Sequence, residues 1–441
     1  WWGMTQYEDI TELIGDTPVV KVDKEVTGLE NIEVYAKLEY YNPFGSIKDR
    51  IGHYLLKDNL DELKSEDKTV IESSSGNTAK ALKTITGINN LEFKTLTNRI
   101  KLDHVKDTLL VLGTEIEELP GKSECPDPTD PDDPLSQIER LVEQNPDEYF
   151  HSGQYTSENN TKAHYETTGQ EIIEDLGKVD YLFGGLGTSG STKGVAKALK
   201  EENPDTEVHG IIADPSDFIP GIRNSNEMWE VGLFDRKLYD NFVEVDSTDA
   251  LDSMVDLMKN TGIMGGPTTG ANFHALIQEL QKIDPELEEE KKAVFFACDR
   301  YEPYTDYIRE RKGGLFGEEK EKKGLQKLSK EEIEDAPQIG VEEAQEIVED
   351  QDVTVVDIRS PNAFKTMHLP SSINIPKDYL TELYREASPF PESNKILFVC
   401  PIGKMSKRFA AIEQKKGREA YSLKEGIKLW REAGLPMESG D

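Results

Sequence analysis

The feature that most constrains the fold is an alternation of short apolar runs with polar loops and helical stretches. The apolar runs lie at residues 34–39, 69–72, 179–183, 208–213 and 293–297. Several of them lead into loops rich in Gly, Ser and Thr, and then into segments whose apolar residues recur at helical spacing. Strands that alternate with helices form parallel sheets, so the sequence predicts an α/β chain.

A change of composition divides the chain. With 441 residues, the chain is long enough for several domains. Between about residues 313 and 337, Gly, Glu and Lys replace the apolar runs, which predicts a charged linker that is helical in part. Beyond it, strands are predicted at 353–357 and 395–399, and helices at 406–415 and around Trp430. We therefore predict a first unit at 4–312, a linker at 313–337 and a second, smaller α/β unit at 338–441.

Charge and cysteine content argue against several classes of protein. Acidic residues outnumber basic residues 86 to 51, giving a net charge of −35, so neither nucleic acid nor an anionic membrane is an expected partner. This acidity fits an ordinary solvated surface or a salty cytoplasm. The cysteines Cys125, Cys298 and Cys400 do not make a disulfide framework and indicate a reducing compartment. We find no signal peptide, membrane-spanning run or metal motif, and expect a cytoplasmic protein.

One lysine stands where its amine can be reactive. Residues 40–50 read YYNPFGSIKDR, in which Asn-Pro and Gly-Ser predict a turn before a helix. Lys48 would then lie in the first helical turn, where the positive end of the helix dipole disfavours an ammonium. A neutral amine condenses with an aldehyde to form an imine. An ordinary solvated lysine is the alternative.

Three further loops could bind the groups of a cofactor or substrate. Residues 184–194 (GGLGTSGSTKG) follow a strand and precede a helix, so backbone N–H groups and hydroxyls could hold a phosphate, although neither nucleotide fingerprint is present. Residues 73–78 (SSSGNT) could hold a carboxylate and leave Asn77 free to donate to a ring oxygen. Residues 266–271 offer threonine hydroxyls that could meet a ring nitrogen. For these last two loops, a helix N-cap is the alternative.

Together these motifs resemble the fold-type II pyridoxal-phosphate enzymes, and within them the cysteine synthase and cystathionine β-synthase family. The resemblance covers residues 5–305. It rests on I-G-x-T-P at 14–18, N-P-x-G-S-x-K-D-R at 42–50, the substrate loop at 74–78, the phosphate loop at 185–191 and the turn at 266–271. Ser replaces the family's Thr at Ser74, and Ser189 and Ser191 are conservative departures. The resemblance implies two α/β subdomains built on parallel sheets.

The resemblance also implies roles for individual residues. Lys48 would bind pyridoxal 5'-phosphate as an imine and move the substrate's α-proton. Asn77 would contact the ring oxygen, and Thr268 the ring nitrogen. The residues implied to hold the cofactor are Lys48, Asn77, Gly187, Thr188, Ser189, Gly190, Ser191 and Thr268. The residues that would hold the substrate are Ser74, Ser75, Gly76, Thr78, Gln154 and Arg223.

The implied reaction is the β-replacement of O-acetylserine or O-phosphoserine by sulfide, which gives L-cysteine. Arg223 could pair with a phosphate and favour O-phosphoserine, with a surface arginine as the alternative. A cystathionine β-synthase, which uses homocysteine as the nucleophile, is the rival activity. A homodimer is expected.

A cysteine marks the second unit. Cys400 follows the strand at 395–399 and precedes a tight loop and a helix, whose N–H groups would stabilise a persulfide anion. An inert core cysteine is the alternative. The unit resembles a single-domain rhodanese at 356–361, 368–376 and 426–436.

The rhodanese resemblance implies that Cys400 carries sulfane sulfur. The loop that would hold it consists of Pro401, Ile402, Gly403, Lys404, Met405 and Ser406. Met405 stands where Arg is common, and Ser406 stands where related phosphatases need an arginine, so phosphatase activity is not expected. The alternative is a unit that acts only as a binding or regulatory module.

Overall fold

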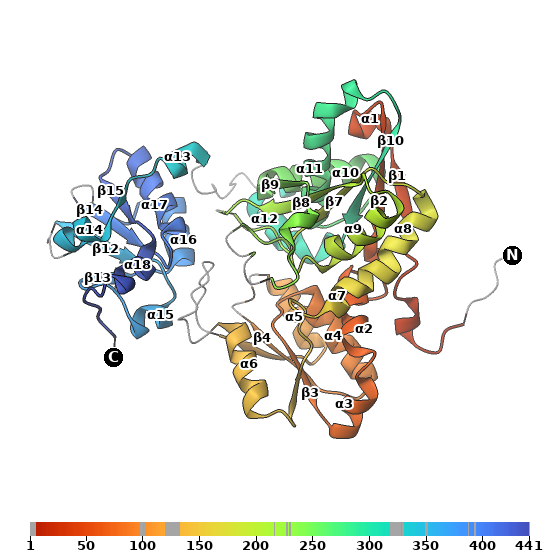
Figure 1. Cartoon of the computed structure of the whole chain (residues 1–441), viewed down its shortest axis with the longest axis horizontal. Helices are drawn as coiled ribbons and strands as arrows, with labels where there is room; N and C mark the ends of the chain where they lie inside the picture. Colours follow the sequence, from red (N-terminus) through yellow and green to blue (C-terminus); the bar gives the residue numbers. More distant parts are fainter. Residues whose placement is uncertain are drawn as a thin grey trace. The chain divides into compact units, whose positions relative to one another are not determined.

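The computed structural model describes residues 6–97, 100, 102–119, 133–215, 217–225, 228, 231–317, 328, 330–348, 352–386, 388–391 and 394–440. The chain divides into two compact units (Figure 1). The first contains Trp1–Glu117 and Ile138–Glu319, and the second contains Glu118–Gln137 and Lys320–Asp441.

A six-stranded sheet forms the centre of the first unit. Its strands, in spatial order, are β1 (Val19–Val22), β2 (Ile32–Leu38), β10 (Lys291–Ala297), β7 (Tyr181–Gly185), β8 (Glu207–Ala213) and β9 (Asn241–Val245). β1 pairs antiparallel with β2, and the other neighbours are parallel. The predicted strands at 34–39, 179–183, 208–213 and 293–297 are confirmed. Because β2, β10 and β7 are parallel, the segments that follow them emerge at one edge of the sheet.

A smaller sheet lies in the same unit. Its order is β5 (Glu115–Glu118), β4 (Phe93–Thr97), β3 (Thr69–Glu72) and β6 (Tyr149–His151). β3 is parallel to both β4 and β6. Its core combines Leu56, Val70, Leu82 and Phe93. The two sheets confirm the expected pair of α/β subdomains, although β3 is the only strand of the smaller sheet that the sequence predicts.

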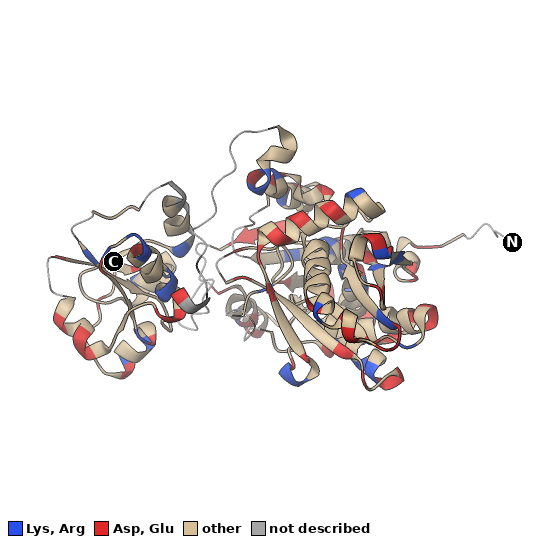
Figure 2. Ribbon diagram, turned by 90° about the horizontal axis from the view of Figure 1, so that it is seen from above, with Lys and Arg blue, Asp and Glu red and all other residues tan. Residues whose placement is uncertain are grey.

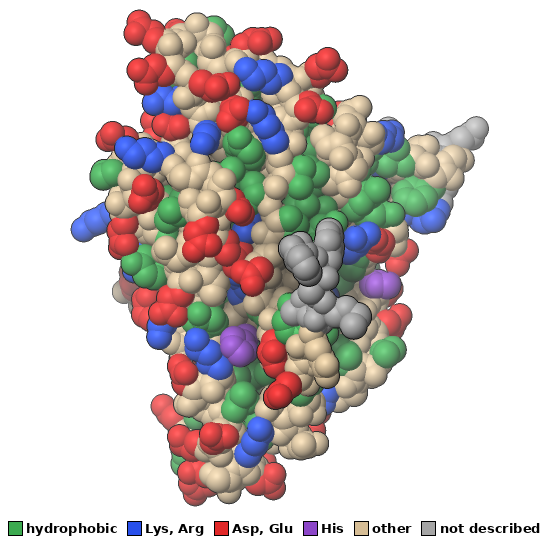
Figure 3. All heavy atoms as spheres, turned by 90° about the vertical axis from the view of Figure 1, so that its right-hand side faces the viewer, with side chains coloured by type: hydrophobic (Ala, Val, Ile, Leu, Met, Phe, Trp, Pro, Cys, Tyr) green, Lys and Arg blue, Asp and Glu red, His purple; other side chains and the backbone are tan. Residues whose placement is uncertain are grey.

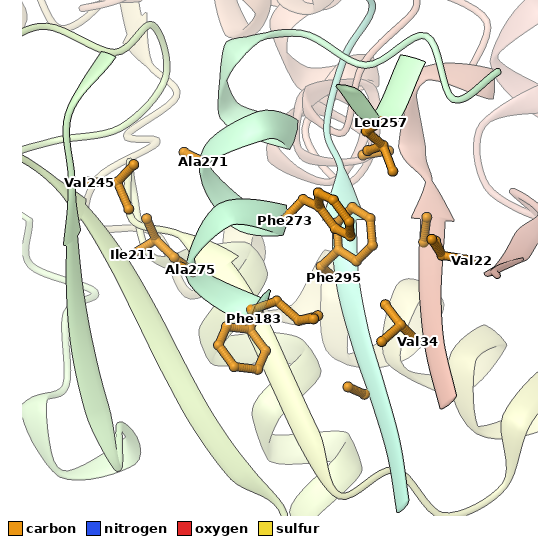
Figure 4. Packing of buried hydrophobic residues seen from close by; sticks show 14 of the residues in the cluster. Val22, Val34, Phe183, Ile211, Val245, Leu257, Ala271, Phe273, Ala275 and Phe295 are labelled. Atoms are coloured by element: carbon orange, nitrogen blue, oxygen red, sulfur yellow. The ribbon is translucent and has the colours of Figure 1, made fainter. Parts of the chain in front are cut away.

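Helices cover both sheets. The regular helices of the first unit are α1 (Lys24–Thr27), α2 (Lys48–Leu56), α3 (Leu60–Glu66), α4 (Asn77–Ile88), α5 (Asp103–Val111), α6 (Pro134–Gln144), α7 (Glu158–Ala163), α8 (Gly169–Leu176), α9 (Gly190–Glu202), α10 (Ser247–Thr261), α11 (Pro267–Ile283) and α12 (Thr305–Arg311). Phe273 of α11 packs on Phe295 of β10 with ring centroids 5.5 Å apart (Figure 4). Each such buried ring contributes about 1.5–3 kcal/mol to folding.

Residues 162–176 have the apolar spacing of one continuous helix, but in the structure this helix is interrupted. A π-helical turn, His164–Thr168, separates α7 from α8. At this turn α9 approaches closely, since a Cβ on Gly194 would lie 2.4 Å from the Thr161 carbonyl oxygen and 2.8 Å from the His164 Cβ. Residues 98–112 also have helical spacing, and of these Asp103–Val111 form α5.

The second unit contains a five-stranded parallel sheet. Its order is β11 (Gln338–Ile339), β15 (Ala420–Leu423), β14 (Lys395–Val399), β12 (Val353–Asp357) and β13 (Ser372–Asn374). Its helices are α13 (Lys330–Glu334), α14 (Val341–Ile347), α15 (Pro361–Thr366), α16 (Lys377–Glu386), α17 (Lys404–Lys415) and α18 (Gly426–Glu432). The predicted strands at 353–357 and 395–399 are confirmed, as is the helix around Trp430, which is buried.

Parts of the predicted linker lie outside the described residues, as does Cys125. The described ends of the linker are a short turn at Gly313–Phe316 and helix α13. Acidic and basic residues are interspersed along the elements of both units (Figure 2). On the face shown in Figure 3, the described Lys and Arg side chains form no single basic patch. Within the described ranges, no helix is long and apolar enough to cross a membrane.

Candidate active sites

The turn after β2 places Lys48 as the first residue of α2, which confirms its predicted position. The Ile47 N–H donates to the Cys298 carbonyl at 2.8 Å, and the Lys48 N–H donates to Ser46 Oγ at 3.2 Å. The lysine turn is therefore fixed to the residues that follow β10. One of these is Asp299, which forms an isolated bridge with Ser46.

Burial changes the charge balance at this turn. Desolvation lowers the pKa of the Lys48 ammonium, while Cys298 and Asp299 act in the opposite direction. Lowering the pKa increases the fraction of neutral amine, which is the form that attacks an aldehyde. The lowered pKa agrees with the prediction, but its main cause is burial rather than the helix dipole.

A buried ion network anchors α2 behind the lysine. Arg50 Nε lies 2.7 Å from Glu39 Oε2, and Arg50 Nη1 lies 2.6 Å from Glu171 Oε1. Lys37, which is fully buried, lies 2.8 Å from Glu171 Oε2. Buried charges persist only when they are paired, so the network fixes α2 against β2 and α8.

The loop between β7 and α9 forms a close-fitting cradle. A Cβ on Gly187 would lie 2.7 Å from the Gly221 carbonyl oxygen, and a Cβ on Gly190 would lie 1.9 Å from Asn160 Oδ1. Ser189 adopts a left-handed backbone with φ of 63°. Its hydroxyl is buried without a hydrogen bond of normal geometry. The nearby side chains of Thr188 and Ser191 are also buried, so hydroxyls and a helix N-terminus converge where an anion would bind.

The loop between β3 and α4 rests on a buried carboxylate. Glu72 accepts hydrogen bonds from the Ser73 N–H at 2.8 Å, the Ser152 hydroxyl at 2.6 Å and the Gln154 N–H at 2.9 Å. Gln154 Nε2 donates to the Ser73 carbonyl at 2.6 Å. The structure therefore brings Gln154 to the predicted substrate loop.

The other residues of the substrate loop differ in their exposure. Ser74 Oγ accepts the Ala79 N–H at 3.1 Å, so this serine supports the first turn of α4, although the N-cap residue is Gly76. Ser75 is exposed, Gly76 is partly buried and Thr78 is buried. The exposed Ser75 and the adjoining backbone are the parts of the loop that a small anion can reach.

The remaining predicted residues approach the same region. Thr268 Oγ1 donates to the Pro220 carbonyl at 2.6 Å, and its methyl group would lie 3.2 Å from a Cβ on Gly185. The Arg223 guanidinium lies over the Tyr155 ring, 4.8 Å from its centroid. The Arg223 N–H donates to the Leu186 carbonyl at 2.8 Å. Arg223 is therefore partly buried beside the cradle rather than extended into solvent.

Sequence reasoning missed three residues that organise this region. Glu72 supports the substrate loop, and Asn160 Nδ2 bridges the Gln154 carbonyl at 2.7 Å and the Thr188 hydroxyl at 2.9 Å. Asp299 accepts a hydrogen bond from Asn77 Nδ2 at 2.7 Å. Asp299 lies two residues beyond the end of the parallel strand β10, a position that often faces a ligand and could have singled it out. The spacing of Asn160 carries no such signal.

The second site lies after β14. Cys400 is buried, and its Sγ lies 3.2 Å from Ser406 Oγ, which lies 2.7 Å from Ser422 Oγ. Gly403 takes a left-handed φ of 77° and precedes α17. The helix begins at Lys404, earlier than the predicted residue 406, so Lys404, Met405 and Ser406 lie in its first turn. Of the predicted loop, Ile402 and Lys404 are exposed, whereas Pro401, Gly403 and Met405 are buried.

Lys48, with its lowered pKa, and the glycine-lined cradle both follow parallel strands of the large sheet, β2 and β7. Together they fit a phosphorylated aldehyde cofactor, because the cradle has donors and no room for Cβ atoms. The chain belongs to the pyridoxal-phosphate dependent enzyme family, whose profile matches residues 10–299. Pyridoxal phosphate is therefore its cofactor. A rhodanese-like domain matches residues 340–433.

Relatives narrow the class to enzymes like cysteine synthase and cystathionine β-synthase. The chain is 30% identical to a cystathionine beta-synthase of Apis mellifera, over 68% of this chain and 61% of that protein. It thus spans about three-fifths of that relative. It is 31% identical to a cysteine synthase of Aquifex aeolicus, over 62% of this chain and 83% of that protein.

Solved structures that resemble this chain belong to the same class of enzyme. A hydrogen sulfide-producing enzyme from Fusobacterium nucleatum superposes with a TM-score of 0.59 at 31% identity, covering 68% of this chain and 100% of that one. The O-acetyl serine sulfhydrylase isoform 3 of Entamoeba histolytica gives 0.61 at 25% identity, with 69% and 92% covered.

Proposed function

We propose that the first unit is a cysteine synthase, in which sulfide replaces the β-substituent of O-acetylserine or O-phosphoserine. The observation that carries this proposal is the environment of Lys48. Its turn is fixed and its pKa is lowered, which suits an amine that first holds the cofactor and, once released, accepts a proton. When bound, the cofactor supplies an electron sink for charge that develops at the substrate's α-carbon.

The other steps would be carried out by residues of the chain itself. Lys48 Nζ would take the α-proton and later return it, while the cradle residues Gly187, Thr188, Ser189, Gly190 and Ser191 would hold the phosphate. Thr268 would offer a hydroxyl rather than a carboxylate to the ring nitrogen, which would leave the ring uncharged and favour elimination. To donate there, its O–H must turn away from the Pro220 carbonyl. The substrate carboxylate would bind at the loop Ser74, Ser75, Gly76 and Thr78 beside Gln154. Their assignments stay predictions.

Product analysis tests the activity. The purified full-length chain, supplied with pyridoxal phosphate, is incubated with either serine ester and with sulfide or homocysteine in separate assays. We expect L-cysteine from sulfide at a rate well above that of cystathionine from homocysteine. Cystathionine as the sole product would instead establish the rival cystathionine β-synthase, the activity named for the Apis relative.

Arg223 provides a test of the leaving group. The guanidinium lies beside the loop of Gln154 and could pair with the phosphate of O-phosphoserine. We expect Arg223→Ala to raise KM for O-phosphoserine by roughly 10- to 100-fold, the value of a hydrogen bond to a charged group, and to change KM for O-acetylserine less than about twofold. Arg236→Ala is the matched control, because Arg236 also stacks on an aromatic ring, that of Phe242. Equal effects on both donors would remove Arg223 from phosphate recognition.

For the second unit we propose that Cys400 carries sulfane sulfur. The Cys400 thiolate would attack the outer sulfur of thiosulfate, the S–S bond would break, and sulfite would leave a persulfide on Cys400. A thiol reductant would then take up the outer sulfur and release sulfide as it becomes a disulfide. The hydrogen bond between Cys400 and Ser406 and the rhodanese-like family match support this step.

The coupling of the two activities gives a prediction. We expect Cys400→Ser to abolish L-cysteine formation from thiosulfate plus a thiol reductant, while formation from free sulfide changes less than about twofold, since only the thiolate form of cysteine attacks sulfur. Both rates are measured on the same preparation, so the sulfide assay is the internal control. Survival of both activities would show that the second unit does not feed the first.

The unit boundaries at 312 and 338, the homodimer, the cytoplasmic location and the small-molecule partners stay part of this proposal. Size measurement of the purified chain tests the dimer. We expect no nucleic acid or membrane partner, because acidic residues outnumber basic residues 86 to 51. Basic and acidic side chains are mixed on the face shown in Figure 3.

A further inference from the structure

Asp299 stands where three segments of the first unit meet. Its carbonyl accepts the Gly266 N–H at 2.9 Å, and its backbone pairs with Ser46 in the lysine turn. Its side chain reaches the first residue of α4, Asn77, which is 222 positions earlier in the sequence. Only 6% of Asp299 is exposed.

The two carboxyl oxygens of Asp299 have different surroundings. Oδ2 accepts a hydrogen bond from Asn77 Nδ2 at 2.7 Å and a second, short one from the Tyr304 hydroxyl. Oδ1 is buried without a hydrogen-bond partner among the described residues, and a Cβ on Gly266 would lie 2.6 Å from it. Tyr304 Oη also lies 3.4 Å from Asn77 Nδ2, so the three polar groups form a closed triangle.

This triangle fixes the orientation of the Asn77 amide. If the amide turned over, Asn77 Oδ1 would face Asp299 Oδ2, and two acceptors would meet in a buried place. Burial, reinforced by Asp299, raises the pKa of Tyr304 well above its usual value, so Tyr304 stays a donor. Asn77 Nδ2 donates to Asp299 Oδ2 and, at 3.4 Å, toward Tyr304 Oη. These two oxygens are hydrogen-bonded to each other, so one N–H of the amide faces both of them and the second N–H is left for another acceptor.

We propose that Asp299 is a positioning residue of the cofactor site, which with Tyr304 holds Asn77 so that its second N–H meets the pyridoxal-phosphate ring oxygen. The inference rests on the proposed function, because it takes Asn77 as a ligand of the cofactor. Asp299 acts through Asn77 and through the turns at Ser46 and Gly266.

Equilibrium binding of pyridoxal phosphate to the apoprotein tests this inference. We expect Asp299→Leu and Asn77→Ala each to weaken binding by roughly 10- to 100-fold, because each removes the same positioned hydrogen bond. The double variant should bind no more weakly than the weaker single variant, since the residues act as one unit. Asp299→Asn keeps an acceptor oxygen and should bind within roughly threefold of the wild type.

The control separates positioning from general stability. Asp284 is also buried and accepts backbone N–H groups, from Glu30 at 2.9 Å and Asn31 at 2.8 Å. Asp284→Leu should lower the melting temperature of the apoprotein without changing the cofactor affinity of the folded fraction. Should Asp299→Leu not fold, Tyr304→Phe in the wild-type and Asn77→Ala backgrounds decides the question. The Tyr304→Phe substitution should weaken binding of pyridoxal phosphate in the wild-type background and have no further effect in the Asn77→Ala background.

Additive losses in the double variant, or unchanged affinity in Asp299→Leu, would overturn the inference. Failure of this inference can be told apart from failure of the proposed function. A wild-type protein that binds the cofactor but forms no cysteine refutes the activity alone. A protein that forms cysteine while Asp299→Leu binds normally refutes the positioning role alone.

Discussion

Replacing Lys48 by alanine is expected to lower the rate of cysteine formation by at least about 10³-fold. The substitution removes both the amine that attaches the cofactor and the group that moves the α-proton, and proton transfer alone contributes about 10²- to 10⁴-fold. The loss should fall on kcat far more than on KM, because Lys48 is not expected to hold the substrate carboxylate. Steady-state rates at saturating sulfide measure it.

A second lysine of the same helix is the control. Lys57 lies at the C-terminal end of α2, with its Nζ 3.3 Å from the Tyr54 ring centroid. Lys57→Ala should change the rate by less than about twofold, since its contact is with a ring on the same helix. In addition, borohydride treatment should attach the cofactor permanently to the wild type and to Lys57→Ala, but not to Lys48→Ala. A Lys48→Ala enzyme that keeps a tenth of the rate would contradict the assignment.

The position of Lys48 and of the glycine-rich cradle could be predicted because local residue types determine them. Asn-Pro and Gly-Ser pairs make turns, and the glycines of the cradle stand where a Cβ would collide, as at Gly190. The central strands β7, β8 and β10 are apolar runs buried on both faces, which a single sequence reveals well.

The contacts that complete the site could not be predicted, because they join residues far apart in the chain. Asn77 meets Asp299, and Glu72 meets Gln154, which is 82 positions later. Burial, which no local pattern measures, is also what lowers the pKa of Lys48. The strand β6 was missed because only three residues, all partly exposed, form it.

Arg50→Leu is expected to lower the free energy of unfolding of the first unit by about 3–5 kcal/mol, since removing one partner of a buried ion network leaves the other charges uncompensated. Arg50 binds Glu39 and Glu171, and Glu39 is fully buried. Hydrogen exchange of the amides in α2 and α8 under increasing urea reports this loss for the first unit alone. Lys282→Leu is the control: its pair with Glu279 lies at 2.7 Å, but the lysine is 58% exposed, so it should cost at most about 1 kcal/mol.

The pH dependence of that loss identifies the partner responsible. Burial alone would raise the pKa of Glu171, but Arg50 and then Lys37 outweigh it and lower the pKa from 4.5 to about 2. Because the folded-state pKa is the lower one, this carboxylate contributes about 3 kcal/mol that is present above its unfolded-state pKa and lost as the pH falls through about 2. Arg50→Leu removes the main cause of the shift, so the difference in stability between wild type and variant should be greatest above about pH 5 and shrink toward about pH 2. A difference that stays constant over this range would show that Arg50 does not stabilise the unit through Glu171, which leaves its contact with Glu39.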